Sequence, residues 1–191
     1  MRVIAGTARS MPLRTVKGMD IRPTTDRTKE TLFNILMPYI PGCRFLDLYA
    51  GSGSIGIEAL SRGASVAFFV ENARASQLLI RENLEFTKLI DRARFAFGDV
   101  QAVLGRLSGE EPFDIIFMDP PFLKGLERQT LELLADSPLP AKDGLIVVEA
   151  SPKTDFSYLE DLGYVKVKER VYGMSQHLFL RRKKDIEGEK E

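Results

Sequence analysis

An α/β fold with a doubly wound, mostly parallel seven-stranded sheet is predicted for this chain of 191 residues. The first reason is that short apolar runs alternate with amphipathic segments along most of the sequence. This alternation is typical of strands joined by helices that cover both faces of a sheet. The second reason is that only four residues, 172–175, separate the last two strand-like runs. Because a link of this length favours an antiparallel hairpin, the sheet is expected to end in antiparallel strands.

The N-terminal segment is expected to form a small β-ribbon, with two short strands within residues 2–17 around a turn rich in Gly, Arg, Ser and Pro. Such a ribbon is marginal alone and has to lean on the main domain. A helix follows, since Thr25 or Asp26 can cap its N-terminus and Pro38 stops it. This helix is expected to bury four apolar side chains: Leu32, Phe33, Leu36 and Met37.

From residue 44 onward the pattern of alternating elements is regular. Strands are expected at 45–49, 66–70, 94–97, 113–118, 145–149, 164–171 and 176–182. Helices are expected after the Gly/Ser-rich loop, after Asn72 over about 17 residues, and over 126–135. The domain organisation is accordingly a ribbon at 1–20, a main domain at 21–184, and an acidic tail at 185–191 that is expected to be disordered.

Composition excludes several classes of protein. The sequence contains no apolar run of about 20 residues that could span a membrane, and its first residues lack the apolar core of a signal peptide. The single cysteine, Cys43, allows no internal disulfide, and the single histidine, His177, gives no metal cluster. A cytoplasmic, monomeric protein without metal is expected, and hydrolytic triads and zinc chemistry are set aside.

Charge is unevenly distributed although the formal net charge is +0. Residues 1–30 carry seven Lys or Arg against three Asp or Glu, and residues 166–184 carry seven against one, whereas the middle of the chain is acidic. Two basic ends on one small domain could form a footprint for phosphates if they meet in space. The alternative is that these charges are simply solvated.

The first strand-to-helix loop carries a glycine motif. Gly51, Gly53 and Gly56 match G-x-G-x-x-G after a strand and before a helix, and Glu71 ends the next strand. Small residues let the backbone approach a ligand, and an acid at the end of the second strand can accept hydrogen bonds from ribose hydroxyls. Up to this point NAD and S-adenosylmethionine (SAM) fit equally well.

Acidic residues at four consecutive strand ends favour SAM. Asp47, Glu71, Asp99 and Asp119 all fall near the carboxyl edge of the predicted sheet, where ligands of open α/β sheets bind. Such a ring would repel a pyrophosphate, whereas SAM carries a sulfonium and an ammonium and no phosphate. Asp47 in particular suits the amino end of a methionine moiety.

The tetrapeptide Asp119-Pro120-Pro121-Phe122 follows the apolar run 113–118. Two prolines remove two backbone donors and stop the strand, which leaves carbonyls unused by a ladder. Asp119 adds an acceptor, and Phe122 adds a flat apolar face. Together they could hold a planar ring that carries an NH2 group, although a Pro-rich turn alone is the simpler interpretation of this motif in isolation.

These motifs make the chain resemble class I SAM-dependent methyltransferases that act on amino groups, and more closely the RsmD family of 16S ribosomal RNA guanine-N2 methyltransferases. The glycine loop and Asp-Pro-Pro-Phe specify the superfamily. The segment 22–27 (Arg-Pro-Thr-Thr-Asp-Arg) before the Leu-Phe-Asn helix, the segments 2–6 and 58–64, and Tyr172-Gly173 narrow the resemblance to the family. The resemblance covers nearly the whole chain.

The resemblance implies a role for each motif. Asp119 and the Pro120 carbonyl would accept hydrogen bonds from guanine N2–H, with Pro121 in the same motif and Phe122 stacked on a flipped base. SAM, the expected cofactor, would be held by Asp47, Ala50, Gly51, Ser52, Gly53, Glu71, Asn72, Asp99 and Val100. The expected partner is 16S ribosomal RNA, within a small subunit or its assembly intermediate. Candidate RNA contacts are Arg2, Arg9, Arg14, Lys17, Arg22 and Arg27.

Alternative functions remain open at this point. The same motif could methylate adenine N6 in DNA or RNA, or glutamine in protein, although glutamine enzymes usually have Asn where Asp119 stands and no separate DNA-recognition domain is present. A non-catalytic SAM-binding or RNA-binding module is an alternative of another class, against which the intact motif argues. An NAD dehydrogenase is the most distant of these alternatives.

Overall fold

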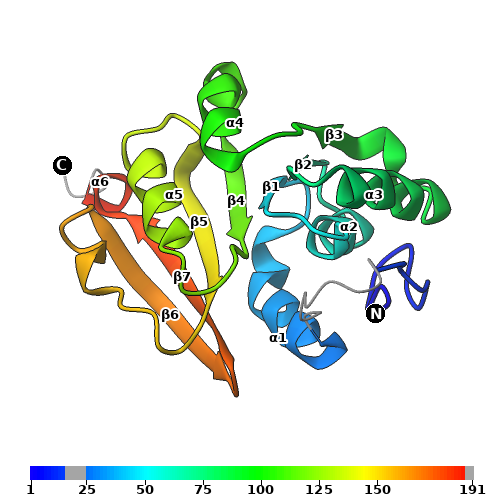
Figure 1. Ribbon diagram of the computed structural model, residues 1–191, viewed down its shortest axis with the longest axis horizontal. Coiled ribbons are helices and arrows are strands. Elements are labelled where there is room, and N and C mark those ends of the chain that lie inside the picture. Colours follow the sequence, from blue (N-terminus) through cyan, green and yellow to red (C-terminus); the bar gives the residue numbers. More distant parts are fainter. Residues whose placement is uncertain (16–24, 188–191) are drawn as a thin grey trace. The chain divides into compact units, whose positions relative to one another are not determined.

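The computed structural model describes residues 1–15 and 25–187 of the chain (Figure 1). These residues belong to two compact units, Met1–Val100 and Gln101–Glu191, and each unit is described by itself. The strands follow the order β3-β2-β1-β4-β5-β7-β6 in a seven-stranded sheet. The sheet is parallel except at its C-terminal strands, which confirms the predicted fold class.

The first unit contains three parallel strands with helices between them. Its elements in chain order are α1 (Asp26–Leu36), the 3₁₀ turn η1 (Met37–Tyr39), β1 (Arg44–Leu48), α2 (Ser54–Ser61), β2 (Val66–Val70), α3 (Arg74–Phe86), η2 (Ile90–Arg92) and β3 (Ala93–Phe95). In β1 and β2 only the first residue is more than slightly exposed, as expected for strands covered on both faces. The register pairs Asp47 of β1 with Phe69 of β2.

Helix α1 begins where the sequence predicts and ends at Leu36, one residue earlier than predicted. The Thr25 side chain caps it by accepting a hydrogen bond from the Thr28 amide (3.2 Å), and Pro38 falls in the 3₁₀ turn that follows Leu36. Leu32, Phe33 and Leu36 are fully buried. The prediction for Met37 was wrong, because this residue has left the helix and its side chain is 55% exposed.

The second unit contains a parallel pair of strands extended by a hairpin. Its elements are α4 (Val100–Arg106), η3 (Leu107–Gly109), β4 (Phe113–Met118), α5 (Leu126–Ala135), β5 (Pro140–Ala150), η4 (Ser157–Leu159), β6 (Tyr164–Tyr172), β7 (Ser175–Arg182) and α6 (Lys183–Glu187). Strand β5 pairs parallel with β4 and antiparallel with β7. Figure 1 shows β6 and β7 as the long orange and red arms of the predicted hairpin.

Two short helices were not predicted. Helix α4 follows β3, and α6 includes residues 185–187 of the tail that the sequence suggested would be disordered. The tail is ordered there because Asp185 accepts a hydrogen bond from the Arg182 guanidinium (2.7 Å). Residues 188–191 lie outside the described residues.

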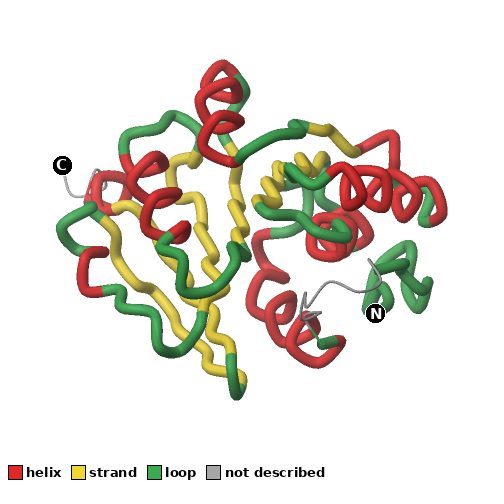
Figure 2. The backbone as a smooth tube through the Cα atoms, viewed as in Figure 1, coloured by secondary structure: helices red, strands yellow, loops and turns green. Residues whose placement is uncertain are grey.

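The N-terminal segment, described over residues 1–15, has one antiparallel bridge, Arg2 with Pro12, in place of two strands. Figure 2 shows this segment as loop. Backbone hydrogen bonds join its two arms, such as that from the Val3 amide to the Met11 carbonyl (2.9 Å). The amides of Ile4 (2.8 Å) and Ala5 (3.0 Å) donate instead to the Glu58 carboxylate of α2. The segment therefore leans on the unit, as a marginal ribbon must.

Glycine at position 6 is required for this docking. Gly6 has a φ of +85°, and a Cβ built there would lie 1.9 Å from the carbonyl oxygen of Ser61 in α2. Ser61 also donates to the Ala5 carbonyl (2.6 Å) and accepts from the Ala8 amide (3.0 Å) through its hydroxyl. Only a residue without a side chain allows so close an approach of the segment to α2.

Candidate active site

The loop between β1 and α2 takes a tight, left-handed path. Tyr49, Gly51 and Gly53 have φ angles of 63°, 57° and 76°. The loop is closed by a hydrogen bond from the Gly53 amide to the Ala50 carbonyl (2.7 Å), and Ala50 donates in turn to Val70 of β2 (3.0 Å). A Cβ at Gly53 would also lie 3.2 Å from Ile80. Glycine is therefore needed both for the turn and for packing against α3.

Asp47 contacts the first turn of α2, which directly follows this loop. Its side chain is 1% exposed, and its Oδ2 accepts a hydrogen bond from the Gly56 amide (2.9 Å), at the start of α2. Burial raises the pKa of Asp47 to about 7, the hydrogen bond from Gly56 opposes this shift, and the charge of Glu71 adds to it. The sequence predicts that Asp47 binds a methionine amino group, and in the structure its carboxyl also braces the start of α2.

The buried Asp47 carboxyl is expected to make stability fall as pH rises. The pKa of Asp47 is higher in the folded state than its value of 3.8 in the unfolded state, so between these two pKa values the folded state binds a proton that the unfolded state has lost. This proton binding stabilises the folded state at low pH, and the stabilisation is lost as pH rises through the folded pKa. Relative to Asp47→Asn, which keeps an acceptor for Gly56, the wild-type free energy of unfolding should drop by roughly 2–3 kcal/mol between pH 5 and pH 8. Urea denaturation of both proteins at the two pH values measures this difference, and parallel pH curves would contradict the assignment.

Glu71 joins the ends of β1 and β2. One carboxylate oxygen accepts from the Gly51 amide (2.8 Å) and the other from the Ala73 amide (2.8 Å). Each oxygen keeps further acceptor capacity, since a carboxylate has about four lone-pair sites. Glu71 thus lies directly beside the glycine loop, where an acceptor for ribose hydroxyls is expected. Asn72 follows it and is exposed.

The segment after β3 also lies beside the end of β2. The Gly98 amide donates to the Glu71 carbonyl (3.0 Å), which brings Asp99 and Val100 near the end of β2. Asp99 is exposed, whereas the Val100 side chain is 5% exposed. The three acidic strand ends of the first unit, Asp47, Glu71 and Asp99, are therefore gathered at one edge, as the sequence predicts.

This edge fits the cofactor expected from the sequence. Two glycines leave the loop backbone uncovered by side chains, and the carboxylates around it suit a ligand that carries cationic and hydroxyl groups. Among the described residues, no group of three or more His, Cys, Asp or Glu could hold a metal ion.

Asn83 of α3 is a site residue that sequence analysis missed. It is 1% exposed, and its side-chain amide donates to the carbonyls of Ser52 in the glycine loop (3.0 Å) and of Arg14 (3.1 Å), while its oxygen accepts from the Arg14 amide (2.9 Å). One buried amide thus fixes the loop and the N-terminal segment together. The available signal was an Asn on the apolar face of α3, next to the buried Leu84.

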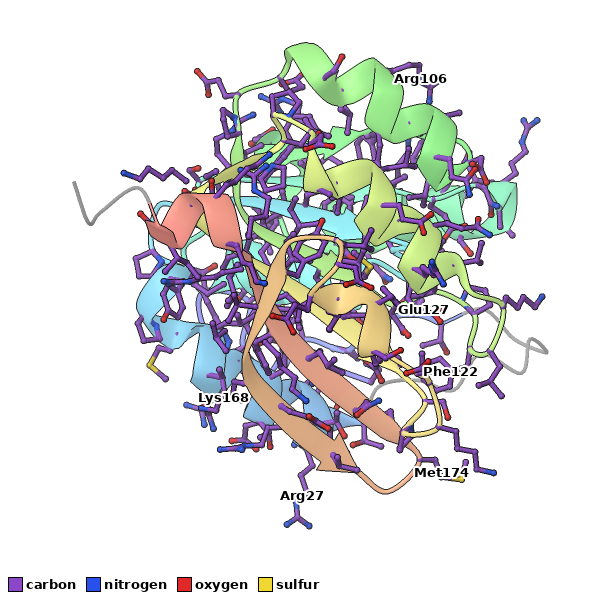
Figure 3. The ribbon with its side chains drawn as sticks, turned by 90° about the vertical axis from the view of Figure 1, so that its left-hand side faces the viewer. Arg27, Arg106, Phe122, Glu127, Lys168 and Met174 are labelled. Atoms are coloured by element: carbon purple, nitrogen blue, oxygen red, sulfur yellow. The ribbon has the colours of Figure 1, made fainter. Side chains whose placement is uncertain are left out.

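In the second unit, Asp119-Pro120-Pro121-Phe122 follows β4 directly and leads into α5. Pro120 is buried, Asp119 and Phe122 are partly buried, and Pro121 is exposed. Figure 3 shows Phe122 beside the loop that joins β4 to α5. The next residue, Leu123, has a φ of 59° and is 66% exposed. A leucine rarely adopts this conformation, so the motif is followed by a strained turn.

Comparison with known proteins identifies the family. Residues 1–181 match the family described as "Conserved hypothetical protein 95". The chain is 40% identical over 150 residues to Ribosomal RNA small subunit methyltransferase D of Escherichia coli (strain K12), covering 78% of this chain and 74% of that protein. It is 35% identical to the protein of the same name from Haemophilus influenzae, covering 91% and 90%. The chain belongs to the RsmD family.

Solved structures agree with this membership. The Escherichia coli protein yhhF, described as a candidate methyltransferase, has a TM-score of 0.80 and 36% identity, covering 95% of this chain and 97% of that one. A more distant structure, SMU.776 in complex with SAH, has a TM-score of 0.64 and 16% identity, and covers 80% of this chain and 48% of that one. That second likeness shows the fold alone. The predicted RsmD resemblance is confirmed by the family match.

The basic residues expected to contact RNA differ in their surroundings. Arg2 pairs with Asp26 (3.1 Å) and Arg14 with Glu82 (2.8 Å), both at exposed positions. Arg9 and Arg27 are exposed, and Figure 3 shows the Arg27 side chain extending away from the ribbon. Lys17 and Arg22 lie outside the described residues. No helix in the described ranges, 1–15 and 25–187, is long and apolar enough to cross a membrane.

Proposed function

We propose that this protein transfers a methyl group from S-adenosylmethionine to the exocyclic N2 of a guanine in 16S ribosomal RNA. The observation that carries this proposal is Asp119-Pro120-Pro121-Phe122 at the end of the buried strand β4, in a chain of the RsmD family. Its relatives in two bacteria are named for small-subunit ribosomal RNA methylation. A ribosomal RNA substrate would place the enzyme in the cytoplasm.

The residues that would hold the cofactor come from the first unit. Glu71 offers carboxylate oxygens to ribose hydroxyls, and the segment Asp99–Val100 offers an acceptor and an apolar surface to adenine. The backbone of Ala50 to Gly53, held at the Gly51 amide by Glu71, would receive the methionine end beside Asp47. Asn72 borders the same place. When bound, this cofactor supplies an electrophilic methyl group on a sulfonium.

The residues of the second unit would prepare the nucleophile. The lone pair of guanine N2 is delocalised into the ring, so the nitrogen is a poor nucleophile until it is made pyramidal. The Asp119 carboxylate and the Pro120 carbonyl would accept hydrogen bonds from its two N–H groups. The lone pair of the nitrogen would then point toward the methyl group of the cofactor. Phe122 would stack on the flipped base, a contact worth about 1–3 kcal/mol. Positioning then supplies most of the rate enhancement.

Nucleoside analysis tests the proposal directly. Small-subunit particles from a strain without this gene would be incubated with the purified protein and isotopically labelled SAM, and the RNA digested for mass spectrometry. We expect label in N2-methylguanosine at one position of the 16S RNA. Label in N6-methyladenosine would overturn the choice of base, and label in ribosomal protein glutamine would overturn the choice of RNA.

Arg9 is the N-terminal residue that we propose for contact with RNA phosphates. It is exposed, whereas Val3, Ala8 and Leu13 of the same segment are buried, so deleting the segment would damage the unit that it packs on. Arg9→Ala should instead leave folding intact, weaken binding to small-subunit RNA, and lower the slope of log affinity against log salt by about one. A salt titration measures the slope; an unchanged slope would assign Arg9 to ordinary solvation.

A further inference from the structure

Glu127 is a buried carboxylate for which the proposed reaction has no use. It lies in the first turn of α5, a few residues after Phe122, and is 5% exposed. Within the described ranges of the chain it forms no hydrogen bond or ion pair. Figure 3 shows Glu127 and Phe122 near each other, at the start of α5 and in the loop before it. Its carboxylate oxygens are therefore available to accept a hydrogen bond from a ligand.

Tyr158 places a second unpaired polar group near Glu127. Its hydroxyl is buried and has no hydrogen-bond partner in the described part of the chain. The ring is held in place by Phe156, with centroids 6.0 Å apart, and by the Arg128 guanidinium, 5.0 Å from the ring centroid. Burial raises the pKa of Tyr158, and the next cause is the negative charge of Glu127. Tyr158 therefore keeps its proton and can act as a donor.

The edge of guanine matches such a pair. Along its Watson–Crick edge guanine presents the N2 amine, then N1–H, then the O6 acceptor. A complementary site needs an acceptor, a second acceptor, and a donor. An ionised carboxylate only accepts, and a tyrosine hydroxyl can donate. Adenine presents an amine followed by N1, which is an acceptor. Two acceptors, adenine N1 and the carboxylate, would then face each other without a hydrogen bond, which disfavours adenine.

We propose that Glu127 accepts a hydrogen bond from N1–H of the target guanine and that Tyr158 donates one to O6, so that these two residues select guanine. This inference rests on the proposed function, in which Asp119 and Pro120 bind the N2 amine. The O6 atom of the base gives the Tyr158 hydroxyl the acceptor that it lacks among the described residues. Arg128, paired with Glu132 (2.9 Å), keeps the tyrosine ring in place.

A base analogue separates this role from a structural one. The guanine that the wild-type enzyme methylates is first located, and particles are then assembled with guanine or 2-aminopurine at that position. 2-Aminopurine keeps the reactive amine and lacks both N1–H and O6. Initial rates give kcat/KM for each substrate with wild type, Glu127→Gln and Tyr158→Phe. Asp136→Asn, at a fully exposed position directly after the same helix, is the matched control.

We expect Glu127→Gln and Tyr158→Phe each to lower kcat/KM for guanine by roughly ten- to a hundredfold while changing the value for 2-aminopurine little, so that discrimination collapses. Asp136→Asn should match wild type with both substrates. An equal loss on both substrates would overturn the inference, because it would mark a general structural effect. Failure of wild type to methylate guanine at all would instead overturn the proposed function.

Discussion

Replacing Asp119 by alanine is expected to abolish methyl transfer to small-subunit particles while leaving SAM binding nearly intact. Asp119 belongs to the second unit and follows β4, whereas the residues proposed to hold the cofactor belong to the first. Loss of its carboxylate removes the acceptor that would orient the target amine in the transition state. Removing one such preorganised polar group commonly costs about a hundred- to a thousandfold in rate.

Three measurements on the Asp119 variant keep binding and chemistry apart. Calorimetry gives the SAM dissociation constant, and single-turnover methylation with particles in excess gives the rate of transfer. Asp119→Asn keeps one side-chain acceptor without the charge and should fall between wild type and Asp119→Ala. Asp136→Ala, at a fully exposed position after α5, is the matched control. Full activity of Asp119→Ala would exclude the mechanism, and a parallel loss of SAM affinity would move Asp119 to the cofactor site.

Local sequence predicted the strands and the motifs well for a physical reason. The bounds of β2, β4 and α5 agree with the predicted ones. Strands buried on both faces are continuous apolar runs, and glycine, proline or an acid marks where they end. The same logic placed Asp47 and Glu71 at strand ends. Strand β5 begins at Pro140, earlier than predicted, because Asp143 and Gly144 resemble a turn and are accommodated within the strand.

Partners far apart in the chain were beyond prediction. Glu58 and Asn83 are polar residues on buried helix faces, and their partners Ile4 and Arg14 lie at the other end of the first unit's sequence. The local sequence pattern does not distinguish a glutamate that accepts hydrogen bonds from a distant segment from a glutamate that is exposed to water. Glu127 and Tyr158 are separated in the same way by β5 and the loop after it. Contacts of this kind depend on the assembled fold.

The Glu58 network yields the largest expected effect on stability. Glu58 and Lys29 are both fully buried, with 3.4 Å between Oε2 and Nζ, and Arg62 donates to Oε1 (2.7 Å). Lys29 also donates to the Arg2 carbonyl (2.6 Å). Burial lowers the pKa of Lys29, and Glu58 is the main influence that opposes the shift. Glu58 is therefore the group that most favours the charged form of this lysine.

Glu58→Ala should lower the free energy of unfolding by about 3–5 kcal/mol, since it leaves Lys29 without its opposite charge and two backbone amides of the N-terminal segment without their acceptor. Urea denaturation at neutral pH measures the loss. Glu82→Ala, which breaks the exposed pair with Arg14, is the control and should cost less than about 1 kcal/mol. The double variant Lys29→Met, Glu58→Gln removes the stranded charge and should recover part of the loss. If it is no more stable than Glu58→Ala, the penalty arises from the undocked N-terminal segment instead of the buried lysine.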